Sequence, residues 1–217
     1  SYKTSTNRAP RQHGTGWPGE EAWVWLRLKL LADAGLVGQP NAGKSTLLNA
    51  VTNAQAKVGA YAFTTTRPQL GVVTHRGREF VLADIPGLIE GAADGAGIGD
   101  RFLGHIERCR VLLHLVDATG DDPVGAWRVV REELAAYGAG LDEKPEIVAL
   151  NKVDALDGKA AARLAKALAK ASGRDVLPLS GAAQTGIDAV LDQLVEAIGP
   201  APEDEAEAGE EQAWSPI

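Results

Sequence analysis

The sequence predicts an α/β fold in which a mostly parallel, six-stranded sheet carries helices on both faces. Three observations support this prediction. Apolar runs of strand length alternate with helical segments between residues 34 and 198, a pattern typical of parallel sheets buried on both sides. The first of these runs leads through a glycine-rich loop into a helix. Several later runs end in short polar motifs, as expected where the carboxyl ends of parallel strands meet in one crevice.

The glycine-rich loop has the sequence GQPNAGKS and spans residues 38–45, between an apolar strand at 34–37 and a helix at 46–51. Gly38 and Gly43 let the chain turn and leave backbone N–H groups free to face phosphate oxygens. The helix N-terminus adds partial positive charge. We expect Lys44 to reach the β- and γ-phosphates of a nucleotide and Ser45 to ligate Mg²⁺. The alternative is a glycine-rich turn with a solvated lysine.

Two strands are predicted in the middle of the chain, at 69–74 and 79–83, with a hairpin turn at 75–78 between them. The polar segment at 55–68 has no strong period and is long enough to indicate a functional loop. Residues 88–100 contain four glycines and are also interpreted as a loop, followed by a helix at 102–108.

The second half of the chain alternates regularly between strands and helices. Strands are predicted at 111–116, 147–150 and 176–179; Pro178 indicates that the last of them lies at a sheet edge. The helices between and after them are predicted to begin at Asp122-Pro123 and to span 158–171 and 187–198. The helix at 158–171 has a basic stripe that we interpret as its solvated face, made up of Lys159, Arg163, Lys166 and Lys170.

Two more motifs complete a site for phosphate and metal. The sequence Asp84-Ile85-Pro86-Gly87 follows a strand, so Asp84 is placed to support Mg²⁺ and the Gly87 N–H to meet the γ-phosphate. Thr65, in the run Phe63-Thr64-Thr65-Thr66-Arg67, is expected to supply a second hydroxyl to Mg²⁺ when the γ-phosphate is present. Taken alone, the first motif is a common turn and the second an ordinary loop composition.

The last two motifs point to a guanine base. Asn151-Lys152-Val153-Asp154 ends an apolar strand, where a buried Asp154 carboxylate would accept hydrogen bonds from N1 and N2 of guanine. Adenine lacks that pair of donors and would leave the carboxylate unpaired. Ser180-Gly181-Ala182 follows the last strand and can offer backbone donors to guanine O6. Together, in this order and at strand ends, the four motifs form a strong pattern.

Composition narrows the class of protein further. The 217 residues include one cysteine, Cys109, and no methionine, so no internal disulfide can form, which fits a reducing cytoplasm. No apolar run approaches the roughly 20 residues that cross a membrane. The net charge is −7, and residues 201–217 contain six acids and no base. We expect this acidic segment to be disordered and the nearly neutral remainder not to be a nucleic-acid binder on charge alone.

The order of motifs resembles the Ras-like P-loop GTPases, and finer features resemble their bacterial Obg subfamily. These features are STNRAP, WLRLKLLADAGLVG before the loop, NAGKST within it, FTT after it, and DIPGLIEGA with FLGHIER further on. The resemblance covers residues 2–199. Three positions depart from the family pattern without removing a ligand, namely Gln39, Ala62 and Gly181.

The resemblance implies a G domain at residues 29–200, preceded at 1–28 by the end of a truncated N-terminal Obg domain and a linker. The alternating residues 22–31 would be the closing strand of that domain, or otherwise a leading strand of the main sheet. The implied function is a GTP- and GDP-binding switch in large ribosomal subunit assembly and the stress response, docking mostly through the missing domain. We expect a cytoplasmic monomer. The nucleotide-binding residues implied are Gly38, Gln39, Pro40, Asn41, Ala42, Gly43, Lys44, Ser45, Phe63, Thr64, Thr65, Thr66, Arg67, Asp84, Ile85, Pro86, Gly87, Asn151, Lys152, Val153, Asp154, Ser180, Gly181 and Ala182.

Hydrolysis is expected to be slow. Ras-type enzymes have a water-orienting glutamine where this sequence has Leu88, so the unassisted rate should not exceed about 10⁻⁴ to 10⁻³ per second. We assign catalytic roles to Lys44, Thr65 and Asn41, with Mg²⁺ held by Ser45, Thr65 and Asp84. Asn41 is a candidate ligand for an activating K⁺. Two alternatives stay open at this point, a nucleotide-dependent scaffold with negligible hydrolysis and an ATP-using P-loop enzyme.

Overall fold

The computed structural model describes residues 19, 32–52, 68–85, 105–138 and 140–200. The strand expected at 22–31, the loops at 55–68 and 88–100 and the acidic segment 201–217 lie outside these ranges almost entirely. The proposed boundaries at residues 28 and 200 therefore stay predictions.

Six strands form one sheet in the order β2-β3-β1-β4-β5-β6. All neighbouring strands are parallel except β2 and β3, which pair antiparallel. The predicted mostly parallel sheet is thus confirmed, and β6 with Pro178 lies at its edge, as predicted. The strands are β1 (Ala32–Val37), β2 (Gln69–His75), β3 (Arg78–Asp84), β4 (Cys109–Asp117), β5 (Glu146–Asn151) and β6 (Val176–Pro178).

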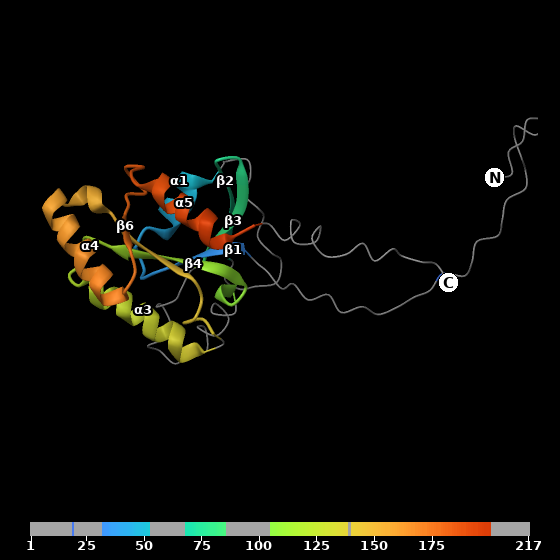
Figure 1. The fold of residues 1–217 in the computed structure, drawn as a ribbon, viewed down its shortest axis with the longest axis horizontal. Helices are drawn as coiled ribbons and strands as arrows, with labels where there is room; N and C mark the ends of the chain where they lie inside the picture. The colour runs from blue at the N-terminus through green and yellow to red at the C-terminus, as the bar shows by residue number, and fades with distance from the viewer. Residues whose placement is uncertain (1–18, 20–31, 53–67, 86–104, 139, 201–217) are drawn as a thin grey trace, which may run out of the picture.

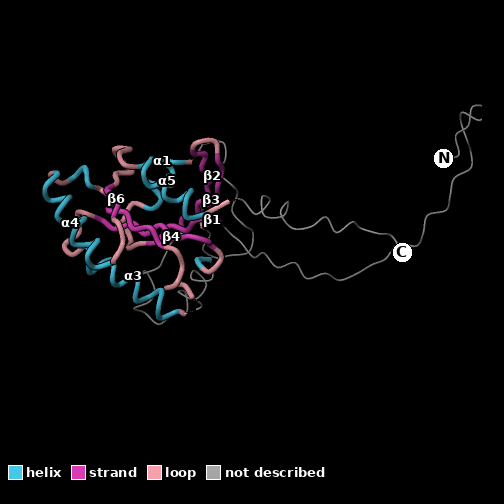
Figure 2. Tube along the Cα trace, in the orientation of Figure 1, coloured by secondary structure: helices cyan, strands magenta, loops and turns pink. Residues whose placement is uncertain are grey.

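Helices cover both faces of the sheet (Figure 1; Figure 2). One face packs against α1 (Lys44–Val51) and α5 (Ile187–Ile198), and the other against α3 (Pro123–Tyr137) and α4 (Gly158–Ser172). A short 3₁₀ turn, η2 (Val153–Ala155), follows β5. The helix predicted at 187–198 is confirmed at both ends, and the one predicted at 158–171 is one residue longer.

The β2–β3 hairpin turns at Arg76 and Gly77, whose φ angles are 49° and 80°. Two successive positive φ angles are the signature of a tight hairpin turn that matches the twist of its strands. This turn is fastened to α5. Asp192 lies 2.7 Å from His75 Nε2 and 2.6 Å from Arg76 Nη2, and Arg78 donates to the Val195 carbonyl at 3.2 Å.

A buried charged cluster lies between the sheet and α3. Glu146, at the start of β5, accepts hydrogen bonds from His114 Nδ1 at 2.8 Å and from Trp127 Nε1 at 3.3 Å. Its other carboxylate oxygen lies 3.5 Å from Arg131 and 3.4 Å from Arg174. The cluster joins β4, β5, α3 and the segment after α4, and it gives His114 a structural role.

The charge states of this cluster follow from burial and pairing. Burial lowers the pKa of His114, although its hydrogen bond to Glu146 opposes this shift. Burial alone would raise the pKa of Glu146, but the hydrogen bond from His114 and the charges of Arg131 and Arg174 hold it below its usual value. Glu146 is therefore a carboxylate that two arginines compensate, beside a neutral imidazole.

We predict that Glu146→Gln lowers the free energy of unfolding by about 3 kcal/mol, because it leaves two arginines facing a neutral amide in a buried site. The measurement is urea unfolding at neutral pH. Glu143→Gln is the matched control, since Glu143 is exposed and its change should stay within about 0.5 kcal/mol. Equal effects of the two substitutions would contradict the prediction.

Candidate functional site

The loop at 38–45 connects β1 to α1, and its backbone requires glycine at both Gly38 and Gly43. Gly38 has a φ of 145°, and a Cβ there would lie 2.3 Å from the Leu115 carbonyl oxygen. Gly43 has a φ of 95°, and a Cβ there would lie 2.3 Å from the Asn151 side-chain nitrogen. Asn41 is also left-handed, with a φ of 61°, a conformation that asparagine tolerates better than most residues. The spacing of the motif is therefore fixed by backbone geometry and close packing.

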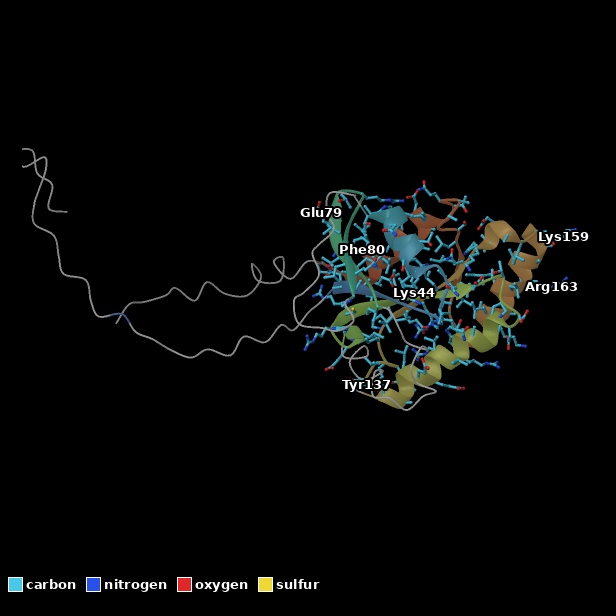
Figure 3. All side chains as sticks on the ribbon, turned by 180° about the vertical axis from the view of Figure 1, so that it is seen from behind. Lys44, Glu79, Phe80, Tyr137, Lys159 and Arg163 are labelled. Carbon is cyan, nitrogen blue, oxygen red and sulfur yellow. The ribbon has the colours of Figure 1, made fainter. Side chains whose placement is uncertain are left out.

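Lys44 folds back over this loop. Its Nζ donates to the carbonyl oxygens of Gly38 at 2.8 Å and Gln39 at 3.0 Å. Figure 3 shows Lys44 in the middle of the domain, where α1 begins beside the sheet. The ammonium group thus lies at the helix N-terminus, where backbone N–H groups and the helix dipole already favour an anion.

Ser45 and Asp84 meet across 39 positions of sequence. The Ser45 hydroxyl donates to Asp84 Oδ2, which joins the first turn of α1 to the end of β3. Asp84 is only 4% exposed, and its second oxygen is buried without a hydrogen-bond partner among the described residues. A hydroxyl and an incompletely satisfied carboxylate suit Mg²⁺, which is bound through few protein oxygens together with water and substrate phosphates.

Asn151 connects the loop to the two motifs expected to contact a base. Its Nδ2 donates to the Ala42 carbonyl at 2.7 Å, and its Oδ1 accepts from the Gly181 N–H at 3.1 Å. Asn151 is 2% exposed, so both ends of its amide are satisfied inside the protein. The sequence predicted that Asn151 belongs to the site. That its side chain bridges two loops is seen only in the structure.

Lys152 turns the chain out of the sheet after β5, with a φ of 64°. Its ammonium lies 2.6 Å from Asp117 Oδ2 at the end of β4. Burial alone would raise the pKa of Asp117, but hydrogen bonds from Lys152 and Thr119 lower it. Asp117 was not among the site residues predicted from the sequence, although its place at the end of an apolar strand was a signal that pointed to it.

Asp154 lies in η2, directly after this turn, and is exposed. The expectation of a buried Asp154 is therefore wrong for the structure described here, because the left-handed Lys152 and the 3₁₀ turn carry the residue to the surface. The carboxylate is accessible to a base approaching from solvent.

The Ser180–Ala182 segment has one unpaired backbone donor. Ser180 N–H donates to the Thr185 carbonyl at 2.9 Å, and Gly181 N–H is occupied by Asn151. Within the part of the chain that the structure describes, the Ala182 N–H has no recorded hydrogen bond. The expectation of several donors for guanine O6 is thereby narrowed to one.

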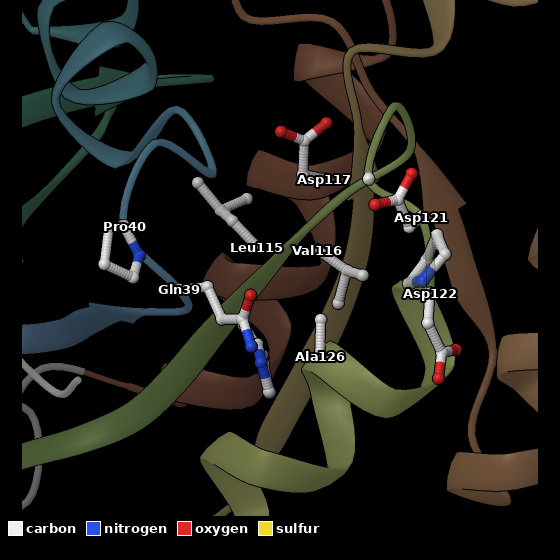
Figure 4. A pocket seen from close by; sticks show the side chains of 11 residues that line it. Gln39, Pro40, Leu115, Val116, Asp117, Asp121, Asp122 and Ala126 are labelled. Carbon is white, nitrogen blue, oxygen red and sulfur yellow. The ribbon is translucent and has the colours of Figure 1, made fainter. Parts of the chain in front are cut away.

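A cavity of about 280 Å³ lies beside the loop, between β4 and the start of α3 (Figure 4). Its lining includes Gln39 and Pro40 from the loop, His114 and Asp117 from β4, and Asp122, which caps α3 through the Gly125 N–H at 2.8 Å. Gln39 and Pro40 were predicted as site residues from the sequence, but the cavity beside them was not predicted.

The remaining predicted site residues are divided between the described and undescribed parts of the chain. Ile85 and Ala42 are buried and Val153 is partly buried, so they shape the site through packing. The predicted contacts of Phe63, Thr64, Thr65, Thr66, Arg67, Pro86 and Gly87 lie outside the described residues and stay predictions. In the described ranges, no group of three or more histidine, cysteine or acidic side chains is placed to hold a metal, and no helix is long and apolar enough to cross a membrane.

Solved structures with this fold include G domains. A variant of Aquifex aeolicus Era bound to GDP and AlF₄⁻ has a TM-score of 0.61 and 26% identity, covering 80% of this chain and 58% of that chain. The G domain of the T. maritima FeoB iron transporter has a TM-score of 0.56 and 21% identity, covering 76% of this chain and 98% of that one. The predicted Ras-like architecture is confirmed by these likenesses.

Curated relatives are closer in sequence. The chain is 73% identical over 217 residues to the GTPase Obg of Rhizorhabdus wittichii, and 66% identical over 219 residues to that of Zymomonas mobilis. Both matches cover the whole of this chain and 63% of the relative, so the chain spans less than two thirds of the length of these proteins. The predicted resemblance to Obg is confirmed. A family model described as "50S ribosome-binding GTPase" matches residues 33–152, and the chain belongs to this family.

Proposed function

We propose that this chain binds GTP and GDP with Mg²⁺ and hydrolyses GTP slowly, as a switch in large ribosomal subunit assembly and the stress response. The main support for the proposal is the pair of hydrogen bonds made by Asn151. They join Ala42, in the glycine-rich loop expected to bind phosphates, to Gly181, in the segment expected to bind the base. One buried amide thereby sets the separation between the places where phosphates and guanine would bind.

The phosphates of the nucleotide would lie at the N-terminus of α1. There the loop backbone and Lys44 provide positive charge, and the two glycines keep side chains out of the approach. Ser45 and Asp84 would hold Mg²⁺, which supplies charge neutralisation for the phosphates. Ser45 lies in the first turn of α1, Asp84 ends β3, and the two side chains already contact each other, which supports a preformed metal site. Thr65 is proposed as a further ligand.

The guanine base would be recognised by Asp154 and the Ala182 N–H. The carboxylate accepts from the two guanine donors, and the N–H donates to O6, so adenine would mismatch both groups. The exposure of Asp154 and the unpaired Ala182 N–H support this assignment, because both groups are available without rearrangement of the described backbone.

The cellular role is proposed from the relatives. They are named as Obg GTPases, and the matching family is described as ribosome-binding. We infer the same setting for this chain, in the cytoplasm, with the large ribosomal subunit as partner. Contacts with the ribosome would be made largely by regions of the relatives that this chain does not span.

We predict that Gly43→Ala weakens GDP binding at least about tenfold, because the new Cβ displaces the Asn151 amide and breaks the bridge. Gly77→Ala is the matched control. Gly77 also has a positive φ, but a Cβ there meets nothing within 4 Å, so only backbone strain of about 1–2 kcal/mol is expected. GDP affinity by calorimetry and urea unfolding separate the two effects. Unchanged GDP affinity in Gly43→Ala would disprove the role of the bridge.

We predict that guanine selectivity depends on Asp154. Asp154→Ala should weaken GDP by roughly 2 kcal/mol, or about 30-fold, the cost of losing a charged hydrogen-bond partner. Asp175→Ala, another exposed aspartate, should leave affinity unchanged. Calorimetry with GDP, GTP and ATP tests this. Equal binding of ATP and GTP by the wild type would exclude the GTPase proposal.

We predict that K⁺ accelerates GTP hydrolysis through Asn41. Leu88 supplies neither charge nor water orientation, so another positive charge is needed near the β- and γ-phosphates. Asn41 is exposed in the loop, and its amide oxygen can hold a monovalent cation. Hydrolysis in K⁺ should exceed that in Na⁺ at equal ionic strength, and Asn41→Ala should remove the difference. Equal rates in both salts for the wild type would refute K⁺ activation; a K⁺ effect that persists in the variant would exclude Asn41.

A further inference from the structure

The helix α4 carries a row of positive charge that the nucleotide site does not use. Four basic residues, all exposed, recur at intervals of four, three and four positions, and helix α4 contains no acidic residue. We call this set the basic face of α4; it consists of Lys159, Arg163, Lys166 and Lys170. At 100° per residue, the four side chains fall within about 60° of one another around the helix axis.

This row points directly away from the protein. Leu168, which is 0% exposed, packs against the sheet and lies about 180° around the helix from Lys159. Figure 3 shows Lys159 and Arg163 on the outer side of α4, at the rim of the molecule. The basic face therefore extends for about 16 Å along an outer surface of the domain.

The four charges are not neutralised by the protein. No ion pair or hydrogen bond involves their side chains in the ranges the structure describes. The nearest acid in sequence, Asp157, caps the helix through the N–H groups of Lys159 and Ala160 at 2.9 Å and 2.8 Å. Four uncompensated cations in one row raise one another's energy, so their arrangement favours an anionic partner.

The helices on the two faces of the sheet differ in composition. The helix α5, which covers the opposite face, contains three acids and no base, namely Asp188, Asp192 and Glu196. The two helices therefore differ in the charge they carry, although Asp192 of α5 is paired with His75 and Arg76. The total charge of the chain conceals a local basic face such as that of α4, because an electrostatic footprint is a local property.

We propose that the basic face of α4 binds the phosphate backbone of RNA. This inference rests on the proposed function for the identity of the RNA, which would be that of the large ribosomal subunit. Phosphates present a regular row of negative charge that a row of lysine and arginine side chains complements without reading sequence. The residues between the cations are mostly alanines, which offer no hydrogen bonds to base edges, so binding is to the backbone.

A membrane surface fits this face less well. Helices that lie on membranes insert large apolar side chains beneath their basic residues. The apolar side of α4 is instead packed against the sheet through Leu168 and Leu164. The structure records one exposed large apolar side chain among the described residues, Val129 of α3, so α4 has nothing to insert.

The test is fluorescence anisotropy with a 5′-labelled 20-base-pair RNA duplex, using the full 217-residue chain in KCl from 50 to 200 mM. Four phosphate contacts predict a slope of log affinity against log salt of about −3 to −4, from the relation for duplex DNA. The variant with all four residues changed to glutamine should lose at least about tenfold in affinity at 100 mM and most of this slope. Glutamine keeps the helix propensity of lysine and arginine, which circular dichroism would verify.

Two matched double variants test whether RNA binding depends on where the positive charges lie or only on the net charge of the protein. Arg163→Gln with Lys166→Gln removes two charges from the basic face, whereas Arg108→Gln with Arg128→Gln removes two exposed charges elsewhere. The first pair should weaken RNA binding and the second should not. Equal weakening by both pairs would overturn the proposal, as would wild-type binding to phosphatidylglycerol vesicles without binding to RNA.

Nucleotide binding is measured on the same samples. GDP affinity should be unchanged in every α4 variant, because α4 contributes no residue to the proposed nucleotide site. Absence of GDP binding in the wild type would refute the proposed function and leave the RNA measurements to decide the role of α4. Normal GDP binding with no RNA affinity in the wild type would refute the inference about α4 alone.

Discussion

The buried amide of Asn151 is the constraint on which the arrangement of the site depends. It holds the loop after β1 and the loop after β6 at fixed positions relative to the end of β5. It also explains the second glycine of the loop motif, since the amide nitrogen occupies the space in which a side chain at Gly43 would lie. A sequence motif at 38–45 is thus partly determined by a residue more than 100 positions away.

Much of the fold could be predicted because its signals are local. Continuous apolar runs identified the central strands, and Asp122-Pro123 identified the start of α3, where Asp122 indeed caps the helix. Strand ends were predicted less well. β4 is longer at both ends than its apolar core, because Cys109 and Asp117 are held by pairing with neighbouring strands, which periodicity does not detect.

The sequence predicted which residues belong to the site, but it did not predict their exposure or the hydrogen bonds and ion pairs that join them. The positions of Lys44, Ser45 and Asp84 follow from their place at strand and helix ends. The exposure of Asp154 does not, because it depends on a left-handed residue whose conformation was not apparent from its lysine side chain. The pairing of Asp117 with Lys152 joins two strand ends and has no signature in either motif alone.

The fastening of the β2–β3 turn to α5 has a mechanical consequence for the opposite end of the hairpin. β3 is a strand of seven residues, roughly 20 Å long, with Arg78 at one end and Asp84 at the other. A shift of β3 along β1 would move Asp84 away from Ser45. The same shift would move the hairpin turn and break the contacts of His75 and Arg76 with Asp192. The contacts between the hairpin turn and α5 therefore help to hold the Asp84 carboxylate beside Ser45, at the other end of β3.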